Sequence, residues 1–213
     1  MPAVVELRNV DKSFKGLEVL RGVDLEIHQG KIHGIQGPNG SGKSVIFKLI
    51  CGFLTPDSGE VLVHDSLKRP GDTFPTGFGV IIDRPGFLGG STGLDNLLEL
   101  AKIQGRVGRD EVVAAMERVG LQPGARQKVR NYSLGMKQKL ALAQAFMEGQ
   151  QALLLDEPFN ALDRSSVEIV RQLLMELRAE GRTIVLTSHN QADIDALCDH
   201  VWLLDDHALE PVR

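Results

Sequence analysis

The chain alternates short, mostly apolar runs with longer stretches whose apolar residues repeat at helical spacing. The clearest of these runs end at polar residues and occupy positions 31–35, 78–82, 152–155 and 183–187. Short apolar runs of this kind are typical of strands buried in a parallel sheet between helices. An amphipathic helical stretch separates the last two runs, which is the order of a parallel βαβ unit. The pattern therefore predicts an α/β fold.

Segments with the period of half-buried strands flank this core. Residues 4–10 and 19–27 partly alternate apolar and polar positions, and a turn is predicted between them at 11–16. A further strand is predicted at 60–63, and a final one at 201–205. These segments extend the predicted sheet structure at both ends of the chain.

The middle of the chain has the apolar periodicity of helices. Apolar residues fall on one helical face over 94–101 and on another over 112–119, and a third helical run is predicted at 136–147. The preceding residues, 84–91, are rich in glycine and predict a loop. We therefore expect a helical insertion in the α/β core.

A glycine-rich segment between the run 31–35 and a helical run at 45–50 has the composition of a phosphate-binding loop. It reads Gly37-Pro38-Asn39-Gly40-Ser41-Gly42-Lys43-Ser44. Its glycines let backbone N–H groups curl around an anion, Lys43 can reach nucleotide phosphates, and the Ser44 hydroxyl can bind Mg²⁺. The alternative is a glycine-rich surface turn, but the strand before the loop and the helix after it favour phosphate binding.

Polar side chains follow two of the buried strands, at the edge where open α/β folds bind ligands. Asp156 and Glu157 end the run 152–155, and His189 follows the run 183–187. Asp156 can hold the Mg²⁺ attached to Ser44, Glu157 can deprotonate an attacking water, and His189 could sense a γ-phosphate. The alternative for the two acids is that they merely cap a strand, which the phosphate loop upstream disfavours. The alternative for His189 is a solvated side chain.

Two other positions remain ambiguous on spacing alone. Phe14 could stack on an adenine ring or simply anchor the predicted turn. The segment with Ser133 and Gly135 opens a helix, where free N–H groups could bind a second anion or Ser133 could be an ordinary N-cap.

Composition sets limits on the class of protein. A formal net charge of −4 gives no electrostatic footprint for wrapping nucleic acid, so no nucleic-acid partner is expected. No apolar run is long enough to cross a bilayer, and the N-terminus lacks the features of a signal peptide, so we expect a cytosolic protein. Cys51 and Cys198 stand alone in apolar contexts and predict buried structural thiols.

Taken in order, the motifs resemble those of the ATPase subunit of ABC transporters. Its Walker A loop is similar to residues 37–44, its signature sequence to 133–137, its Walker B strand to 153–157, its D-loop to 161–163 and its switch histidine to His189. The resemblance covers about residues 3–207. It implies that Phe14 takes the place of the family's adenine-stacking aromatic residue, which is usually Tyr.

The resemblance implies a single ABC ATPase domain over residues 1–213. Its fold would be α/β, a P-loop NTPase (RecA-like) core with a mostly parallel sheet, an N-terminal antiparallel β subdomain and an inserted α-helical subdomain. The core would occupy about 1–90 and 150–213, and the helical signature subdomain about 91–149. Because the chain stops soon after the last core strand, we expect no C-terminal regulatory extension.

The function implied is hydrolysis of ATP to ADP and phosphate, coupled to a separate integral-membrane permease. Two ATPase subunits would pair head to tail, so that Ser133 and Gly135 of one contact the γ-phosphate held by Lys43 of the other. The protein would lie at the inner face of the plasma membrane through the permease. The alternative is a soluble, nucleotide-dependent switch that acts on another protein or on nucleic acid.

Two positions depart from the family pattern. Asp83 stands where most members have the Gln that links Mg²⁺ to the membrane partner, and residues 133–137 read Ser-Leu-Gly-Met-Lys instead of the usual Ser-Gly-Gly-Gln. Both departures are similar to those of the bacitracin and lantibiotic multidrug-export branch.

The expected site residues fall into three groups. The catalytic residues are Glu157, His189 and Lys43. The residues that contact ATP are Phe14, Gly37, Pro38, Asn39, Gly40, Ser41, Gly42, Lys43, Ser44, Val45, Ser133 and Gly135. The residues at Mg²⁺ are Ser44, Asp156 and Asp83.

Overall fold

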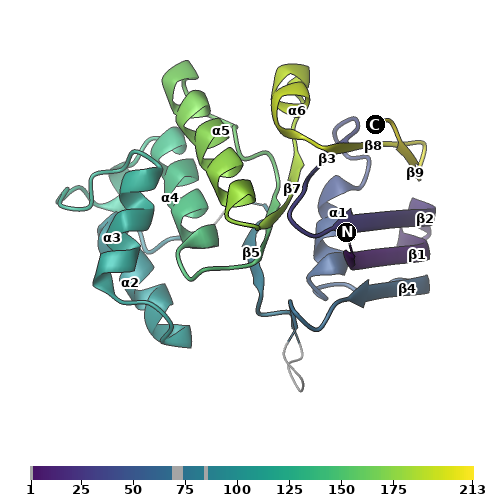
Figure 1. Ribbon diagram of the computed structural model, residues 1–213, viewed down its shortest axis with the longest axis horizontal. Helices are drawn as coiled ribbons and strands as arrows, with labels where there is room; N and C mark the ends of the chain where they lie inside the picture. Colours follow the sequence, from purple (N-terminus) through teal and green to yellow (C-terminus); the bar gives the residue numbers. More distant parts are fainter. Residues whose placement is uncertain (1, 69–73, 84–85) are drawn as a thin grey trace.

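The structure is a computed structural model that describes residues 2–68, 74–83 and 86–213 (Figure 1). Its strands are β1 (Ala3–Phe14), β2 (Leu17–His28), β3 (Ile32–Gln36), β4 (Ser58–Val63), β5 (Phe78–Ile81), β6 (Ala152–Leu155), β7 (Thr183–Thr187), β8 (His200–Asp205) and β9 (Ala208–Pro211). Its α-helices are α1 (Lys43–Ile50), α2 (Gly93–Gln104), α3 (Arg109–Arg118), α4 (Leu134–Phe146), α5 (Arg164–Ala179) and α6 (Gln191–Leu197), and a 3₁₀ turn, η1, covers Val129–Asn131.

The central sheet has the strand order β5-β6-β7-β3-β8-β9. All its neighbouring strands run parallel except β8 and β9, which are antiparallel. β3 lies between β7 and β8, so the loop that leaves β3 begins in the middle of the sheet's carboxyl edge. The same edge receives the ends of β6 and β7, where the chain places Asp156 and His189.

This sheet separates two hydrophobic cores, because successive residues of a strand point to opposite faces. In β6, Leu153 and Leu155 face the core shared with α4 and α5, whereas Ala152 and Leu154 face the core shared with α1, β1 and β2. All four side chains are buried. The continuous apolar run is thus explained by helices on one face and by helix and sheet on the other.

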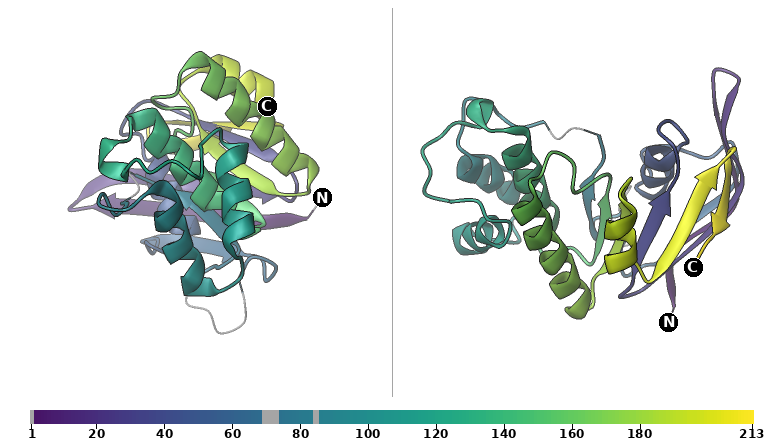
Figure 2. Two further views of the ribbon diagram at one scale, coloured as in Figure 1. Left: turned by 90° about the vertical axis from the view of Figure 1, so that its left-hand side faces the viewer. Right: turned by 90° about the horizontal axis from the view of Figure 1, so that it is seen from above.

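A second, three-stranded antiparallel sheet with the order β2-β1-β4 covers α1 on the side away from the helices (Figures 1 and 2). The predicted turn at 11–16 is wrong, since β1 continues to Phe14 and only Lys15 and Gly16 form the turn. Register shifts along β1 break the alternation of apolar and polar residues there, which hides the strand from a period-two pattern.

Helices α2, α3 and α4 gather at the opposite end of the molecule (Figures 1 and 2). They follow β5 and precede β6 in the chain, which gives the predicted helical insertion. Close approach of β5 to α4 requires a glycine, because a Cβ on Gly79 would lie 1.6 Å from the carbonyl oxygen of Ala145. Residues 86–91 form the predicted loop, and positions 84 and 85 of that prediction lie outside the described residues.

The predicted strand at 201–205 is β8. It is not the final strand, because a tight turn at Asp206 and His207 leads into β9, which pairs with it. Its sequence, Ala-Leu-Glu-Pro, is too short and too polar to give a strand pattern of its own. Cys51 and Cys198 are free and buried, as predicted, and burial raises the pKa of each thiol to about 12.

Candidate active site

The loop between β3 and α1 is a cradle of backbone groups. Gly37 and Gly42 adopt positive φ angles of 150° and 113°. A Cβ on Gly37 would lie 2.3 Å from the carbonyl oxygen of Leu204. The hydroxyl oxygen of Ser41 is buried and has no hydrogen-bond partner among the described residues. A turn this tight with an unused donor fits an anion.

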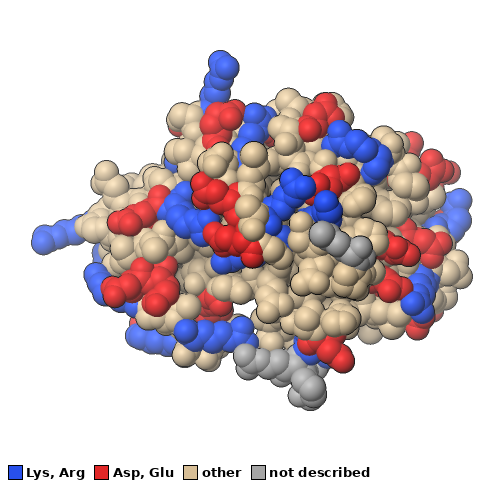
Figure 3. Space-filling model, viewed as in Figure 1, with Lys and Arg blue, Asp and Glu red and all other residues tan. Residues whose placement is uncertain are grey.

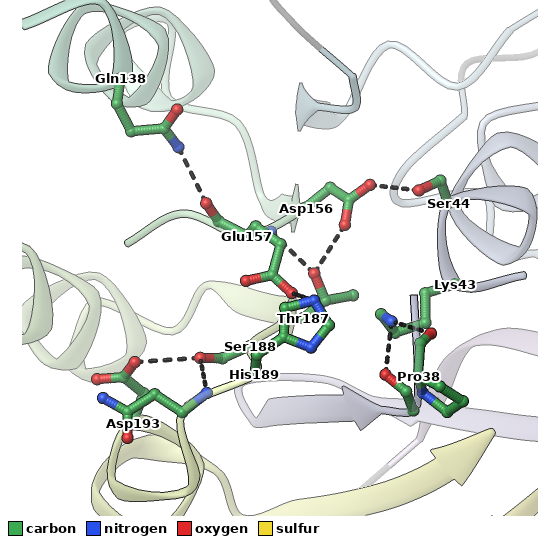
Figure 4. Close-up of polar contacts among 12 residues, drawn as sticks. Pro38, Lys43, Ser44, Gln138, Asp156, Glu157, Thr187, Ser188, His189 and Asp193 are labelled. Carbon is green, nitrogen blue, oxygen red and sulfur yellow. Dashed lines mark hydrogen bonds and ion pairs between the residues drawn. The ribbon is translucent and has the colours of Figure 1, made fainter. Parts of the chain in front are cut away.

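Lys43 opens α1 and is buried under the loop. Its Nζ donates to the carbonyl oxygens of Gly37 at 2.7 Å and Pro38 at 2.9 Å (Figure 4). Burial lowers the pKa of this amine, and the nearby carboxylates of Glu157 and Asp156 oppose that shift. A buried ammonium held only by carbonyl groups favours the arrival of a negatively charged ligand.

A chain of hydrogen bonds joins the ends of three elements beside the loop. The Ser44 hydroxyl of α1 donates to Asp156 Oδ2 at 2.5 Å, and Thr187 Oγ1 at the end of β7 donates to Asp156 Oδ1 at 2.7 Å. Thr187 also accepts from the backbone N–H of Glu157 at 2.8 Å. Thr187 was not predicted, and its position as the last residue of a strand beside the acids is the signal that could have indicated it.

Glu157 is held in an unusual backbone conformation, with φ at 51°. Its Oε1 lies 3.0 Å from Nε2 of His189, and its side chain is 18% exposed. Burial raises the pKa of this carboxyl, aided by Asp156, while His189 and Lys43 act against the rise. A carboxylate with a raised pKa next to a cavity is suited to accept a proton.

Asp193 anchors the loop that carries His189. The Ser188 hydroxyl donates to Asp193 Oδ2 at 3.1 Å, and Arg171 of α5 donates to Asp193 Oδ1 from Nε at 2.9 Å. Asp193 is only 2% exposed. Neither Asp193 nor Arg171 was predicted, because their role depends on contacts between elements far apart in the sequence.

Asp83, an expected Mg²⁺ residue, faces a cation of its own chain. Its Oδ2 lies 2.8 Å from Nζ of Lys48, on the outer side of α1. Its φ is 60°, and its side chain is 65% exposed. The structure gives it no hydrogen bond to Ser44 or Asp156.

Most of the predicted site residues line one cavity of about 530 Å³. Phe14 lies at its rim and is 40% exposed, and Val19 and Asn160, which were not predicted, also line it. The cavity is bordered by Phe14, Val19, Asn39, Gly40, Gly42, Lys43, Ser44, Val45, Asp83, Asp156, Glu157, Asn160 and His189. An aromatic ring at one end and phosphate-type donors at the other suit a nucleotide.

Ser133 and Gly135 do not line this cavity. Ser133 is the N-cap of α4, and its hydroxyl accepts from the N–H of Met136 at 3.1 Å. Gly135 packs on the backbone of the same chain, since a Cβ there would lie 2.7 Å from the carbonyl oxygen of Ala161. The exposed side chain of Leu134 lies between them.

The residues present also fit a divalent cation bound together with a phosphate. Among the residues that the structure describes, no cluster of three or more His, Cys, Asp or Glu side chains could hold a metal alone. Ser44 and Asp156 offer oxygen atoms side by side, and Mg²⁺ is typically held by one or two carboxylates plus phosphate oxygens and water. The site therefore suits a metal that arrives with its ligand.

The distribution of surface charge and the lengths of the helices bear on which partners the protein can have. Basic and acidic side chains are interspersed on the face shown in Figure 3, without a wide area of one sign. Within the described ranges, no helix is both long enough and apolar enough to span a bilayer.

Comparison with known proteins gives consistent matches. A family model described as ABC transporter matches residues 20–160. The chain is 35% identical over 207 residues to the ABC transporter ATP-binding protein YybJ of Bacillus subtilis, covering 97% of this chain and 95% of that protein. It is 36% identical over 216 residues to the bacitracin transport ATP-binding protein BcrA of Enterococcus faecalis, covering 100% of this chain and 70% of that one.

A solved structure extends the match to three dimensions. The dimeric post-hydrolysis state of the ATP-binding cassette MJ0796, bound to ADP and phosphate, superimposes with a TM-score of 0.85 at 27% identity. The match covers 98% of this chain and 99% of that one. The ribose import ATP-binding protein RbsA of Yersinia pestis is also similar, at 32% identity over 95% of this chain and 42% of its own length.

Proposed function

Since the chain belongs to the family of ABC transporter ATP-binding proteins, we propose that it hydrolyses ATP to drive a separate membrane permease that exports antimicrobial compounds. As a member of this family it binds ATP with Mg²⁺ and is an ATPase. The class of cargo is supported by the similarity to BcrA, and the export direction by the resemblance of Asp83 and residues 133–137 to the bacitracin and lantibiotic multidrug-export branch. The division into a core (1–90 and 150–213) and a signature subdomain (91–149) is part of this proposal.

The observation that carries the mechanism is the continuous contact from Ser44 through Asp156 and Thr187 to the backbone of Glu157. Lys43 and the loop N–H groups would hold the phosphates, and Ser44 and Asp156 would hold Mg²⁺, which neutralises phosphate charge when bound. Glu157 would take a proton from the attacking water. His189, which contacts the Glu157 carboxylate, would orient that carboxylate toward the γ-phosphate.

The half of the site formed by Ser133 and Gly135 would come from a second subunit. Their location outside the cavity of their own chain supports this, as does the exposed N-terminus of α4. MJ0796, a structural relative, is dimeric in its ADP- and phosphate-bound state. In this proposal ATP holds two copies together head to tail, and hydrolysis lets them separate.

The direct test is Glu157→Gln, which keeps the shape of the base and removes its ability to accept a proton. We expect kcat for ATP to fall by about a hundredfold or more, because general base catalysis typically contributes that much. The variant is also expected to elute as a dimer in ATP and as a monomer in ADP, measured by light scattering.

Glu117→Gln, at an exposed position of α3, is the matched control and should hydrolyse ATP like the parent. Parental turnover in Glu157→Gln would show that the base is assigned wrongly. The export part is tested separately, with the chain and the membrane protein of the neighbouring reading frame in inside-out vesicles. ATP-dependent uptake of bacitracin supports export, whereas failure of any membrane protein to bind the chain favours a soluble switch.

A further inference from the structure

The start of α4 lies against the segment that follows β6 in the same chain. Gln138, one turn into α4, donates its Nε2–H to the carbonyl oxygen of Glu157 at 3.3 Å (Figure 4) and to that of Pro158 at 3.2 Å. Three residues earlier, Gly135 approaches the carbonyl oxygen of Ala161 so closely that a Cβ would lie 2.7 Å from it. Two contacts on one face of the helix thus touch the segment 157–161.

This segment is conformationally strained where the helix touches it. Glu157 and Ala161 have φ angles of 51° and 62°, which non-glycine residues rarely adopt and which persist where surrounding contacts hold them. The N–H of Glu157 is held by Thr187 of the core, and its carbonyl oxygen accepts from Gln138 and from the N–H of Asn160 at 3.2 Å. The backbone on both sides of this side chain is therefore fixed, once from the sheet and once from α4.

We propose that Gln138 is a positioning residue that sets the orientation of Glu157, and that it connects this carboxylate to the N-terminal face of α4. The proposal rests on the function above, in which Glu157 is the base and Ser133 meets the nucleotide of the partner subunit. Under it, a shift of α4 when the partner's nucleotide binds reaches the backbone of the base in the same chain through the Gln138 amide.

The test uses variants of similar size that change only the hydrogen-bonding group. Gln138→Met removes the donor, and Gln138→Glu replaces it with an acceptor that faces two carbonyl oxygens. We expect kcat to fall about tenfold in Gln138→Met and further in Gln138→Glu, with KM for ATP within twofold of the parent, because loss of one or two hydrogen bonds corresponds to about this change in rate.

A double substitution separates positioning from general stability. In the Glu157→Gln background, adding Gln138→Met should not lower the residual rate of phosphate release further, because a residue that acts through the base has no effect once the base is absent. A purely structural role would lower that residual rate and the melting temperature as well.

Gln127→Met is the matched control, since Gln127 also donates to a backbone carbonyl, that of Asn131, but lies away from Glu157. The proposal is overturned if Gln138→Met keeps kcat within twofold of the parent, if Gln127→Met loses as much, or if the loss is unchanged in the Glu157→Gln background. Parental hydrolysis by Glu157→Gln alone would instead overturn the assignment of the base, so the two failures are distinguishable.

Discussion

Backbone strain gathers around the cavity. Asp83, Glu157 and Ala161 all have positive φ angles, and two of them line the cavity. Each such residue costs about 1–3 kcal/mol, so it is kept only where neighbouring groups enforce it. Lys48, Thr187 and Gln138 supply the enforcing contacts at Asp83 and Glu157. The site is therefore shaped by residues that do not themselves line the cavity.

The ion pair between Lys48 and Asp83 gives a prediction about metal use. If Asp83 contributes to Mg²⁺ binding, it must leave Lys48 to do so, and Lys48→Met should make it available. Since an exposed pair of this kind contributes about 0.2–1 kcal/mol, we expect the Mg²⁺ concentration for half-maximal ATPase activity to fall by about 1.4- to fivefold. Titration of ATPase activity with Mg²⁺ at saturating ATP measures this.

Lys102→Met is the control, because Lys102 pairs with Glu99 on the surface of α2. In the double variant Lys48→Met with Asp83→Asn the effect should disappear. An unchanged Mg²⁺ requirement in Lys48→Met would remove Asp83 from the metal site.

Site residues that belong to a short local motif could be predicted from the sequence. Lys43 and Ser44 follow a glycine loop, and Asp156 and Glu157 end an apolar run, so their proximity follows from where parallel strands end. Gln138 and Lys48 could not be predicted, because they act through hydrogen bonds or an ion pair to residues at least nineteen positions away. No periodicity records such a pairing.

The loop 86–91 is rigidly attached to α2 although its tip is exposed. Asn96, which is 4% exposed, accepts from the N–H of Leu88 at 2.7 Å and donates to its carbonyl oxygen at 3.1 Å. The Leu88 side chain is nevertheless 63% exposed, whereas Phe87 packs against the core. A fixed backbone with a free apolar side chain is suited to contact a permease.

Leu88→Glu is expected to uncouple transport from hydrolysis. A charge at this exposed position should leave the free energy of unfolding within about 0.5 kcal/mol of the parent, and basal ATPase activity with it. ATP-driven transport with the permease should be lost, because the apolar contact would be replaced by a carboxylate that must lose its water. Parallel assays of ATPase activity and transport in vesicles measure both.

Ile103→Glu, on the exposed surface of α2, provides a control of the same chemical change. It should transport like the parent. Loss of ATPase activity in proportion to transport in Leu88→Glu would contradict a docking role for this loop.

Elements were predictable where one physical rule dominates. The predicted strands 152–155 and 183–187 agree with β6 and β7. Both faces of the sheet are buried there, so each strand is a continuous apolar run that can be recognised without an alternating pattern. The extension of β1 through residues 11–14 was missed because hydrogen bonds replace apolar contacts there: Asp11 accepts from the N–H of Gly22 and from the hydroxyl of Ser58. Because these residues are polar, their composition is the same as that of a turn, and the sequence alone does not distinguish the two.

At the scale of the whole molecule, a cluster of three histidines joins β2, β3 and β8 at the end of the sheet away from the cavity. The ring of His33 is fully buried, stacks on His200 with centroids 4.9 Å apart, and accepts the N–H of His28 through Nε2 at 3.0 Å. Burial lowers the pKa of His33 to about 4, helped by His200, while the carboxylate of Asp199 acts in the opposite direction.

This cluster predicts a loss of stability in mild acid. The unfolded chain binds a proton at His33 near pH 6.5, but the folded chain does so only near pH 4, so stability present above pH 6.5 is lost as the pH falls toward 4. The contribution of His33 amounts to about 3 kcal/mol. In His33→Gln, which keeps an acceptor for His28, the fall in unfolding free energy between pH 7.5 and 4.5 should be smaller by about this amount.

Urea denaturation at the two pH values measures the difference. His64→Gln, at an exposed histidine, is the control and should keep the parental pH dependence. An equal fall in His33→Gln and in the parent would show that the acid sensitivity comes from other groups.

The strand order of the central sheet also governs how the protein is made. β3 and the loop after it leave the ribosome well before their partner strands β7 and β8, which are formed by residues 183–205. Pairing between segments so distant in sequence is slow, and here it must also wait for translation to reach them. A nascent chain therefore carries the Gly37–Ser44 motif without the sheet that holds it in shape until residues 183–205 have been made, so it acquires its affinity for ATP only after that point of translation.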